Sequence, residues 1–268
     1  MHFNAEFFAH QFLWTLTFAA QLVLLVILLG RERAHRYPWF TAGIVLAAVQ
    51  LMAGVLLSGR MAQIPLQELM LALADIAVLV GLLVLVEVAR RAFAGAKRSL
   101  WIVNAAGLVI VAGGLLLVWG PWPARSLLVL NTLLGQLRLM ELVAQKGDTL
   151  VELLTVGLGL MVVIFGRRYK APWRSHTQMI AIGLSITAIS WLTIQQTWQI
   201  IIRTAHPQTQ QAYEQILSLG TKLMNTNKVA YLVALIWWIV WLWLDEPGTA
   251  KTPAVEPKQE LIESSPKQ

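Results

Sequence analysis

Seven apolar stretches, each long enough to cross a lipid bilayer, dominate this chain of 268 residues. A membrane-spanning helix needs about 20 mainly apolar residues to cross a hydrocarbon core of about 30 Å. Such stretches lie near residues 7–30, 38–58, 66–93, 100–120, 149–166, 175–198 and 223–244. Only 13% of the residues are charged, compared with about 25% in a typical soluble domain. The sequence therefore excludes an ordinary soluble enzyme and predicts an all-α bundle of seven transmembrane helices.

An eighth segment, 125–145, is apolar on one face only. Its apolar residues follow helical spacing, whereas Asn131, Arg138 and Gln145 recur every seven residues on another face. This pattern predicts an extra amphipathic helix that lies in the membrane interface rather than crossing it. Together with a short helix predicted inside segment 199–222, it could form a cap over the outer mouth of the bundle.

The basic residues predict the orientation of the bundle. With seven spans, 14 of the 21 basic residues fall on one side, in loops 31–36, 90–98 and 167–174 and in the C-terminal tail. Because cytoplasmic loops carry the excess of Lys and Arg, the N-terminus is expected outside and the C-terminus in the cytoplasm. An eighth span over 125–145 would move the 167–174 cluster outside, which favours seven spans.

The chain divides into a membrane domain, 1–244, and a C-terminal tail, 245–268. The tail contains four prolines among charged and small polar residues. A segment of this composition cannot bury enough apolar surface to fold, so we expect a disordered cytoplasmic tail.

Charged residues inside a span are the strongest candidates for function, because each costs about 2.5–3.5 kcal/mol at the bilayer centre on insertion scales. Asp75 lies well inside the third predicted span, and Glu68 precedes it by seven residues on the same face. Lys228, near Asn227 and Tyr231 in the last span, is at comparable depth and is a candidate partner for Asp75. The alternatives are a structural ion pair for Asp75 and, for Lys228, a side chain that extends to the outer interface.

Small and polar residues form a stripe on the sixth predicted span, at Gly183, Thr187, Ser190 and Thr197. Close helix packing in lipid depends on such residues. Tight packing with interhelical hydrogen bonds is one interpretation of this stripe, and a polar wall of a ligand site that includes Ser190 is the other.

Three other acidic residues have local explanations. Glu87 is followed by Arg90 and Arg91 at helical spacing, which predicts ion pairing near the inner interface. Glu152 falls in the first turn of the predicted span 149–166, where the helix dipole favours an acid. Glu141 belongs to the predicted interfacial helix.

No metal or cofactor site is expected. The chain has no cysteine, and its five histidines fall at predicted span ends or in loops, without the spacing of a ligand pair. It also lacks a phosphate-binding glycine loop and the common hydrolase motifs. We therefore expect no enzyme activity of those types and no catalytic residue.

Two short segments carry a resemblance to a known group of proteins. They are Arg36-Tyr37-Pro38-Trp39-Phe40 in the first inner loop and the junction Phe165-Gly166-Arg167 through Trp173-Arg174-Ser175-His176. With the seven-span layout, the chain resembles a group of uncharacterised bacterial seven-helix integral membrane proteins. It is more loosely similar to the seven-helix sensor regions of histidine kinases, although no kinase module follows the last span. The resemblance implies a multi-pass protein of the bacterial inner membrane.

These observations predict a sensory or accessory membrane protein that binds a small or lipidic ligand near Asp75, Lys228 and the polar face of the sixth span. The alternative is a secondary transporter or proton-coupled carrier that uses Asp75. The expected partners are membrane lipids, including anionic lipids at the inner basic loops, with a protein partner also allowed. The net charge of +7 is explained by these loops, so nucleic acid is not an expected partner.

Overall fold

The computed structural model describes residues 5–57, 59–94, 98–118, 122, 133–165, 175–205 and 209–245. These residues form eight helices and contain no strand. The helices are α1 (Ala5–Gly30), α2 (Arg33–Arg36), α3 (Pro38–Leu57), α4 (Gln63–Ala92), α5 (Arg98–Val118), α6 (Leu133–Phe165), α7 (His176–Thr204) and α8 (Gln210–Trp243). Six of them are long and apolar enough to cross a membrane, and α5 has a shorter apolar part, Ile102–Val118. The all-helical prediction is confirmed, and the helices are compatible with a membrane bundle.

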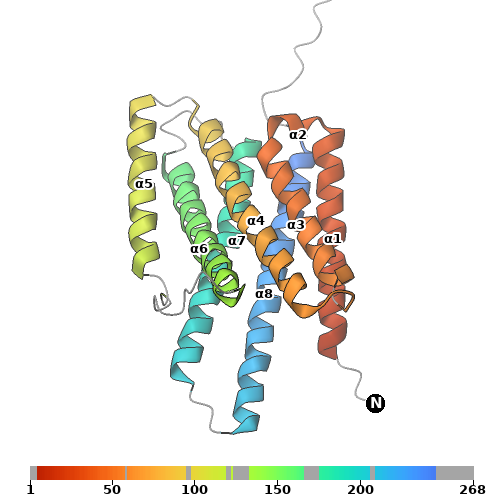
Figure 1. Ribbon diagram of the computed structural model, residues 1–268. Coiled ribbons are helices and arrows are strands. Elements are labelled where there is room, and N and C mark those ends of the chain that lie inside the picture. The colour runs from red at the N-terminus through yellow and green to blue at the C-terminus, as the bar shows by residue number, and fades with distance from the viewer. Residues whose placement is uncertain are drawn as a thin grey trace, which may run out of the picture.

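The long helices alternate in direction along the chain (Figure 1). At one end of the bundle α1, α4, α6 and α8 finish while α3, α5 and α7 begin. We call this the basic end, because it carries Arg31, Arg33, Arg36, Arg90 and Arg91. The opposite end, where α4, α6 and α8 begin, is called the open end.

Helix α6 differs from its prediction, since it runs without a break for 33 residues. The separate interfacial helix predicted over 125–145 is therefore wrong from residue 133 onward, and residues 125–132 lie outside the described part of the chain. No proline interrupts the helix, and the Thr149 hydroxyl donates to the Gln145 carbonyl oxygen at 2.8 Å across the predicted boundary. The polar face around Glu141 and Gln145 lines an internal cavity, which is why its pattern is amphipathic.

Helices α7 and α8 are also longer than the predicted spans. Residues 199–204 belong to α7, and residues 210–222 form the first three turns of α8. The described parts of the two outer segments are thus extensions of long helices, and the predicted cap over the bundle is wrong for them. As Figure 1 shows, α7 and α8 project furthest at the open end.

Glycines allow α4 and α6 to pack closely. A Cβ atom on Gly147 of α6 would lie 2.7 Å from Cγ1 of Val78 on α4. One turn further, a Cβ atom on Gly81 of α4 would lie 3.0 Å from Cγ1 of Val151 on α6. Each helix therefore places a valine against a glycine of the other, the small-residue packing that stabilises helices in lipid.

The apolar core lies towards the basic end. It contains side chains that are at most 2% exposed, among them Leu24, Leu28, Phe40, Leu235 and Trp238. The Trp238 ring meets the Phe40 ring edge to face at 5.2 Å between centroids, a favourable aromatic geometry. Gly183 on α7 makes room for the Trp238 indole. The predicted inward face of residues 175–198 thus packs here against α8.

Polar contacts fasten the helix ends around this core. The Glu87 carboxylate of α4 accepts a hydrogen bond from the Phe40 backbone N–H at 3.0 Å, which satisfies a free donor at the start of α3. It also lies 3.6 Å from Arg91, so the predicted local ion pair is confirmed for that arginine. On the other side, Arg31 contacts Asp245 at 2.8 Å. The basic end is therefore closed by packing and by polar links between helices.

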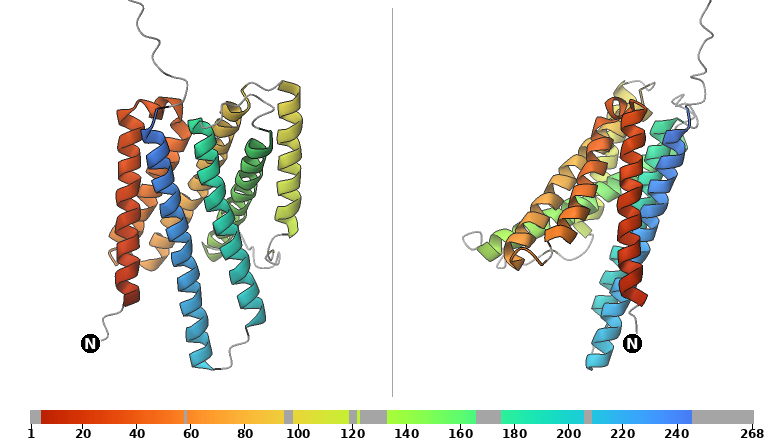
Figure 2. Two further views of the ribbon diagram at one scale, coloured as in Figure 1. Left: turned by 180° about the vertical axis from the view of Figure 1, so that it is seen from behind. Right: turned by 90° about the vertical axis from the view of Figure 1, so that its right-hand side faces the viewer.

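The bundle is less closed at the open end. In the side view of Figure 2, α3, α4 and α6 lean away from α1, α7 and α8 towards that end. The two groups of helices diverge because the tight contacts of the core are concentrated near the basic end. This divergence positions the site described next.

Candidate functional site

A cavity of about 850 Å³ lies where the two groups of helices diverge. Five helices line it: α3 through Gln50, α4 through residues 71–78, α6 through residues 141–148, α7 through residues 191–198 and α8 through residues 217–228. It is large enough for a drug-sized molecule, since ligand pockets commonly measure about 300–1,000 Å³. We call it the outer cavity.

A second cavity of about 420 Å³ lies next to it and extends towards the core. Gln50, Ala77, Asp148 and Trp191 line both cavities, so they mark the junction between them. The walls of this inner cavity include Glu152 and Tyr231 as well as apolar side chains. At the core its lining reaches the buried side chains Phe40, Val84, Leu85 and Trp238.

Acidic side chains occupy one wall. Glu141 and Asp148 line the outer cavity, and Glu152 lines the inner cavity. All three are on α6, and Asp148 and Glu152 are one helical turn apart. Among the described residues, none of the three forms an ion pair. A carboxylate in an apolar setting needs a counter-charge, hydration or a proton. This requirement applies to Asp148 and Glu152, which are partly buried, whereas Glu141 is exposed.

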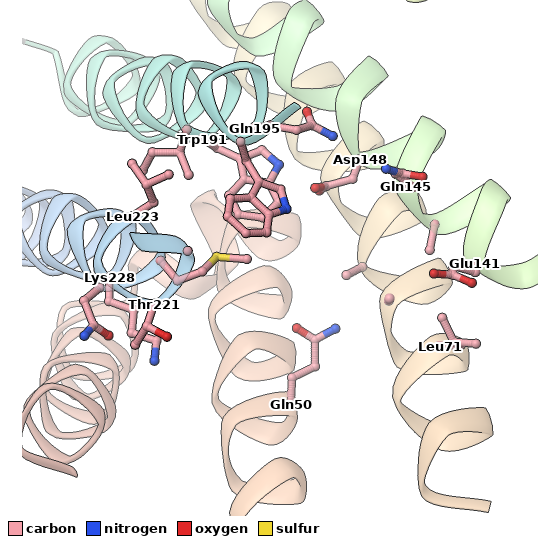
Figure 3. A pocket seen from close by; sticks show the side chains of 18 of the residues that line it. Gln50, Leu71, Glu141, Gln145, Asp148, Trp191, Gln195, Thr221, Leu223 and Lys228 are labelled. Carbon is pink, nitrogen blue, oxygen red and sulfur yellow. The ribbon is translucent and has the colours of Figure 1, made fainter. Parts of the chain in front are cut away.

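The single basic side chain of the outer cavity is on the opposite wall. Figure 3 shows Lys228 on α8, across the cavity from Glu141 and Asp148 on α6. In the described part of the chain Lys228 has no ion pair within 4 Å. The two walls are therefore oppositely charged and do not neutralise each other directly.

Aromatic side chains of α7 form a third wall. Figure 3 shows the Asp148 carboxylate turned towards Trp191, whose indole Nε1 atom is buried without a hydrogen-bond partner. Trp198 lies about two turns further along α7. Its ring packs over Gly220 of α8, where a Cβ atom would lie 2.9 Å from the ring. An indole ring beside a carboxylate is a suitable environment for a cation.

Several amide groups add hydrogen-bonding capacity. Gln50 donates to the Leu73 carbonyl oxygen at 2.8 Å, which fixes its side chain at the junction. Gln195 and Asn225 line the outer cavity, and the oxygen of each side chain is buried without a hydrogen-bond partner. Unsatisfied buried acceptors are uncommon in folded proteins, so these two residues would gain from a donor.

Four of the six predicted site residues lie on or directly behind these cavities. Lys228 lines the outer cavity, and Asn227 and Tyr231 line the inner one. Ser190 donates to the Asn227 side-chain oxygen at 3.5 Å, and the Tyr231 hydroxyl accepts from Gln21 at 3.2 Å. Lys228 is 18 residues into α8, deeper along its helix than the sequence predicted, because α8 begins at Gln210.

Asp75 and Glu68 are elsewhere on α4. Asp75 lines neither cavity and forms no ion pair with Lys228, and its buried Oδ1 atom has no hydrogen-bond partner. Glu68 lines a separate hollow between α4 and α6, together with Gln136 and Met140. The structure thus separates these two acids from Lys228.

Asp148 and Glu152 are the site residues that sequence reasoning missed. A span that starts at residue 149 leaves Asp148 outside the helix and puts Glu152 in its first turn. Helix α6 instead starts at Leu133. The available signal was their spacing of four residues, which places two carboxylates on one face of any helix that includes both.

Comparison with known proteins gives no further assignment. No protein-family model matches the chain, and neither a curated protein nor a solved structure is found to be similar to it.

Proposed function

We propose that this chain is a sensory or accessory membrane protein that binds a small or lipidic ligand in the outer cavity. The observation that carries the proposal is a cavity of about 850 Å³ whose facing walls hold acidic and basic side chains that form no ion pair among the described residues. Charges in a membrane bundle are costly and are found where they bind ligands, ions or protons. No residue of the outer cavity needs to perform chemistry for this role.

The one-sided shape of the site favours binding over passage. The cavities begin in the splayed half of the bundle and end at side chains such as Phe40 and Trp238, which are at most 2% exposed. A ligand in this site would touch α8 directly, and α8 ends at the basic end beside Arg31 and Arg33. Binding could therefore be communicated along α8 to partners at that end.

The orientation belongs to the same proposal. Seven spans, with α5 as the fourth, would place the N-terminus and the open end outside and the basic end in the cytoplasm. The location proposed is a bacterial inner membrane. Anionic lipids would contact the arginines of the basic end, and a protein partner would use the same side.

Native mass spectrometry of protein extracted gently from its own membrane tests the proposal. The wild-type chain should carry a bound species that is lost in Ala77→Trp, because Ala77 is at the junction of the two cavities. Ile76→Trp is the matched control, since Ile76 is 47% exposed on the outer surface of the same helix. A wild-type chain that carries no species, or one retained equally in both variants, would contradict binding in this cavity.

A secondary carrier coupled to protons is the second candidate. The observation in its favour is Asp75, whose buried oxygen has no hydrogen-bond partner. Proteoliposomes that contain the protein should then take up the species found by native mass spectrometry in response to a pH gradient. Asp75→Asn should abolish this uptake. Uptake that is unchanged by this substitution would exclude Asp75 as the coupling group.

A further inference from the structure

The chemistry of the two cavities narrows the class of ligand, an inference that rests on the proposed function. We infer that the site recognises a ligand with a primary ammonium group, held between Asp148 and Trp191, and with an apolar body. The first argument is the number of acidic and basic side chains that line the cavities. Two acidic side chains, Glu141 and Asp148, line the outer cavity together with one lysine, and a third acidic side chain, Glu152, lines the inner cavity.

The position of these charges is the second argument. Lys228 is on the opposite wall, so it does not neutralise Asp148 by direct contact (Figure 3). In an apolar environment a carboxylate that is neither paired, hydrated nor protonated is strongly destabilising, and a cation that arrives with the ligand offsets part of that cost. An anionic ligand near α6 would instead lie against the acidic side chains of that wall.

The aromatic wall supplies the third argument. The Trp191 indole lies beside the Asp148 carboxylate and lines both cavities. A cation held by this carboxylate would lie beside the indole ring, and indole is the best aromatic partner for an ammonium ion. Trp198, further along the same wall, extends the aromatic surface towards the open end.

Hydrogen-bond donors distinguish a primary ammonium from a quaternary one. The side-chain oxygens of Gln195 and Asn225 lack a partner, and carboxylates only accept. A primary ammonium group has three N–H donors and no acceptor, which complements such a site. A quaternary ammonium would leave all of these acceptors unmatched.

The lining of the inner cavity indicates the chemistry of the part of the ligand beyond the ammonium group. Beyond Glu152 and Tyr231, its lining is mainly aliphatic, with Ile44, Val80 and Leu184. An apolar group of modest size would fill this space while the ammonium group remains at the junction. The same head group is found on free amines and on phosphatidylethanolamine, so the test must separate these two sources.

Three small probes with one aromatic body test the inference on the wild-type protein. They are 2-phenylethylammonium, neutral 2-phenylethanol and anionic 3-phenylpropanoate. Binding is measured by tryptophan fluorescence and by the shift of the thermal unfolding midpoint in phosphatidylglycerol nanodiscs. The ammonium probe should bind at least about tenfold more tightly than the alcohol (about 1.4 kcal/mol), and the carboxylate should bind most weakly.

Variants locate the binding. Asp148→Asn should weaken the ammonium probe at least about tenfold and leave the alcohol unchanged. Glu68→Gln is the matched control, because Glu68 lines a different hollow, and it should change neither probe. Phosphatidylethanolamine added to the nanodiscs should compete with the probe if a lipid head group is the natural occupant, and should not compete if a free amine is.

The outcomes distinguish a failure of the ammonium inference from a failure of the proposed ligand-binding function. Equal binding of ammonium and alcohol, or tightest binding of the carboxylate, would overturn the ammonium inference and leave a ligand site in place. If no probe binds, the chemistry of the species found by native mass spectrometry tests the inference. A species without an amine overturns the ammonium inference but leaves the proposed ligand site in place. Absence of both probe binding and any native species overturns the proposed function as well.

Discussion

Replacing Gly147 by alanine is the sharpest test of the packing between α4 and α6. The added Cβ atom would lie 2.7 Å from Cγ1 and 3.1 Å from Cγ2 of Val78, distances at which one of the helices must shift. Overpacking of this kind costs about 1–3 kcal/mol. Alanine also gains about 1 kcal/mol over glycine in a helix interior, so a single variant would mix two opposing effects.

A matched control removes the propensity effect. Gly107 of α5 has no atom within 4 Å of the position that a Cβ atom would take. Gly107→Ala should therefore gain helix propensity without a steric cost. Gly147→Ala should have a free energy of unfolding about 1–3 kcal/mol below that of the control.

Reversible unfolding in mixed micelles, followed by circular dichroism, measures this difference. Val78→Ala removes both Cγ atoms that would clash with the new side chain. In that background Gly147→Ala should be less destabilising, with a coupling energy of about 0.5–3 kcal/mol. If Gly147→Ala is as stable as the control, or if the two substitutions are additive, the close approach of α4 and α6 at this level is refuted.

Three further predictions concern the basic end. Glu87→Ala should destabilise the protein by about 1.5–3 kcal/mol, because it removes a charged acceptor from the buried Phe40 N–H. Glu87→Gln should retain part of this stability. Equal losses of stability in the two variants would contradict the capping role of Glu87. Trp238→Ala should cost about 3–5 kcal/mol, since this ring is 1% exposed, and a loss below about 1 kcal/mol would contradict its place in the core. Asp245→Ala should change stability by less than about 1 kcal/mol, because the carboxylate that contacts Arg31 is 82% exposed; a larger loss in thermal unfolding would show that this contact fastens the end of α8.

Much of the fold could be predicted because apolar length is a strong signal. Every predicted span overlaps one long helix, and the small-residue face on the sixth predicted span does turn inward, as Gly183 against Trp238 shows. The limits of helices were harder to predict, because a polar residue at the end of a span resembles the start of a loop. The sequence pattern separates residues 133–148 from the rest of α6 for this reason, and Gly147-Asp148, which resembles a turn, lies at the predicted boundary.

The site was harder to predict than the fold. Asp148 and Glu152 each had an ordinary local explanation in the sequence, and only the continuous helix α6 brings them to one face. Asp75 stood out in the sequence because apolar residues surround it, yet it is not among the residues that line either cavity. A cavity formed by the divergence of five helices depends on their tilt, which no residue pattern within a single helix encodes.

Accessibility of single cysteines tests the central claim most directly, namely that a water-accessible, acidic cavity reaches Ala77. The chain has no native cysteine, so Ala77→Cys can be labelled alone, with Ala20→Cys as a buried control that is 8% exposed in the wild type. A cationic methanethiosulfonate should modify Ala77→Cys faster than its anionic counterpart, and 2-phenylethylammonium should slow that reaction. The control should remain unmodified. If Ala77→Cys reacts as slowly as Ala20→Cys with both reagents, the cavity is closed and the account is contradicted.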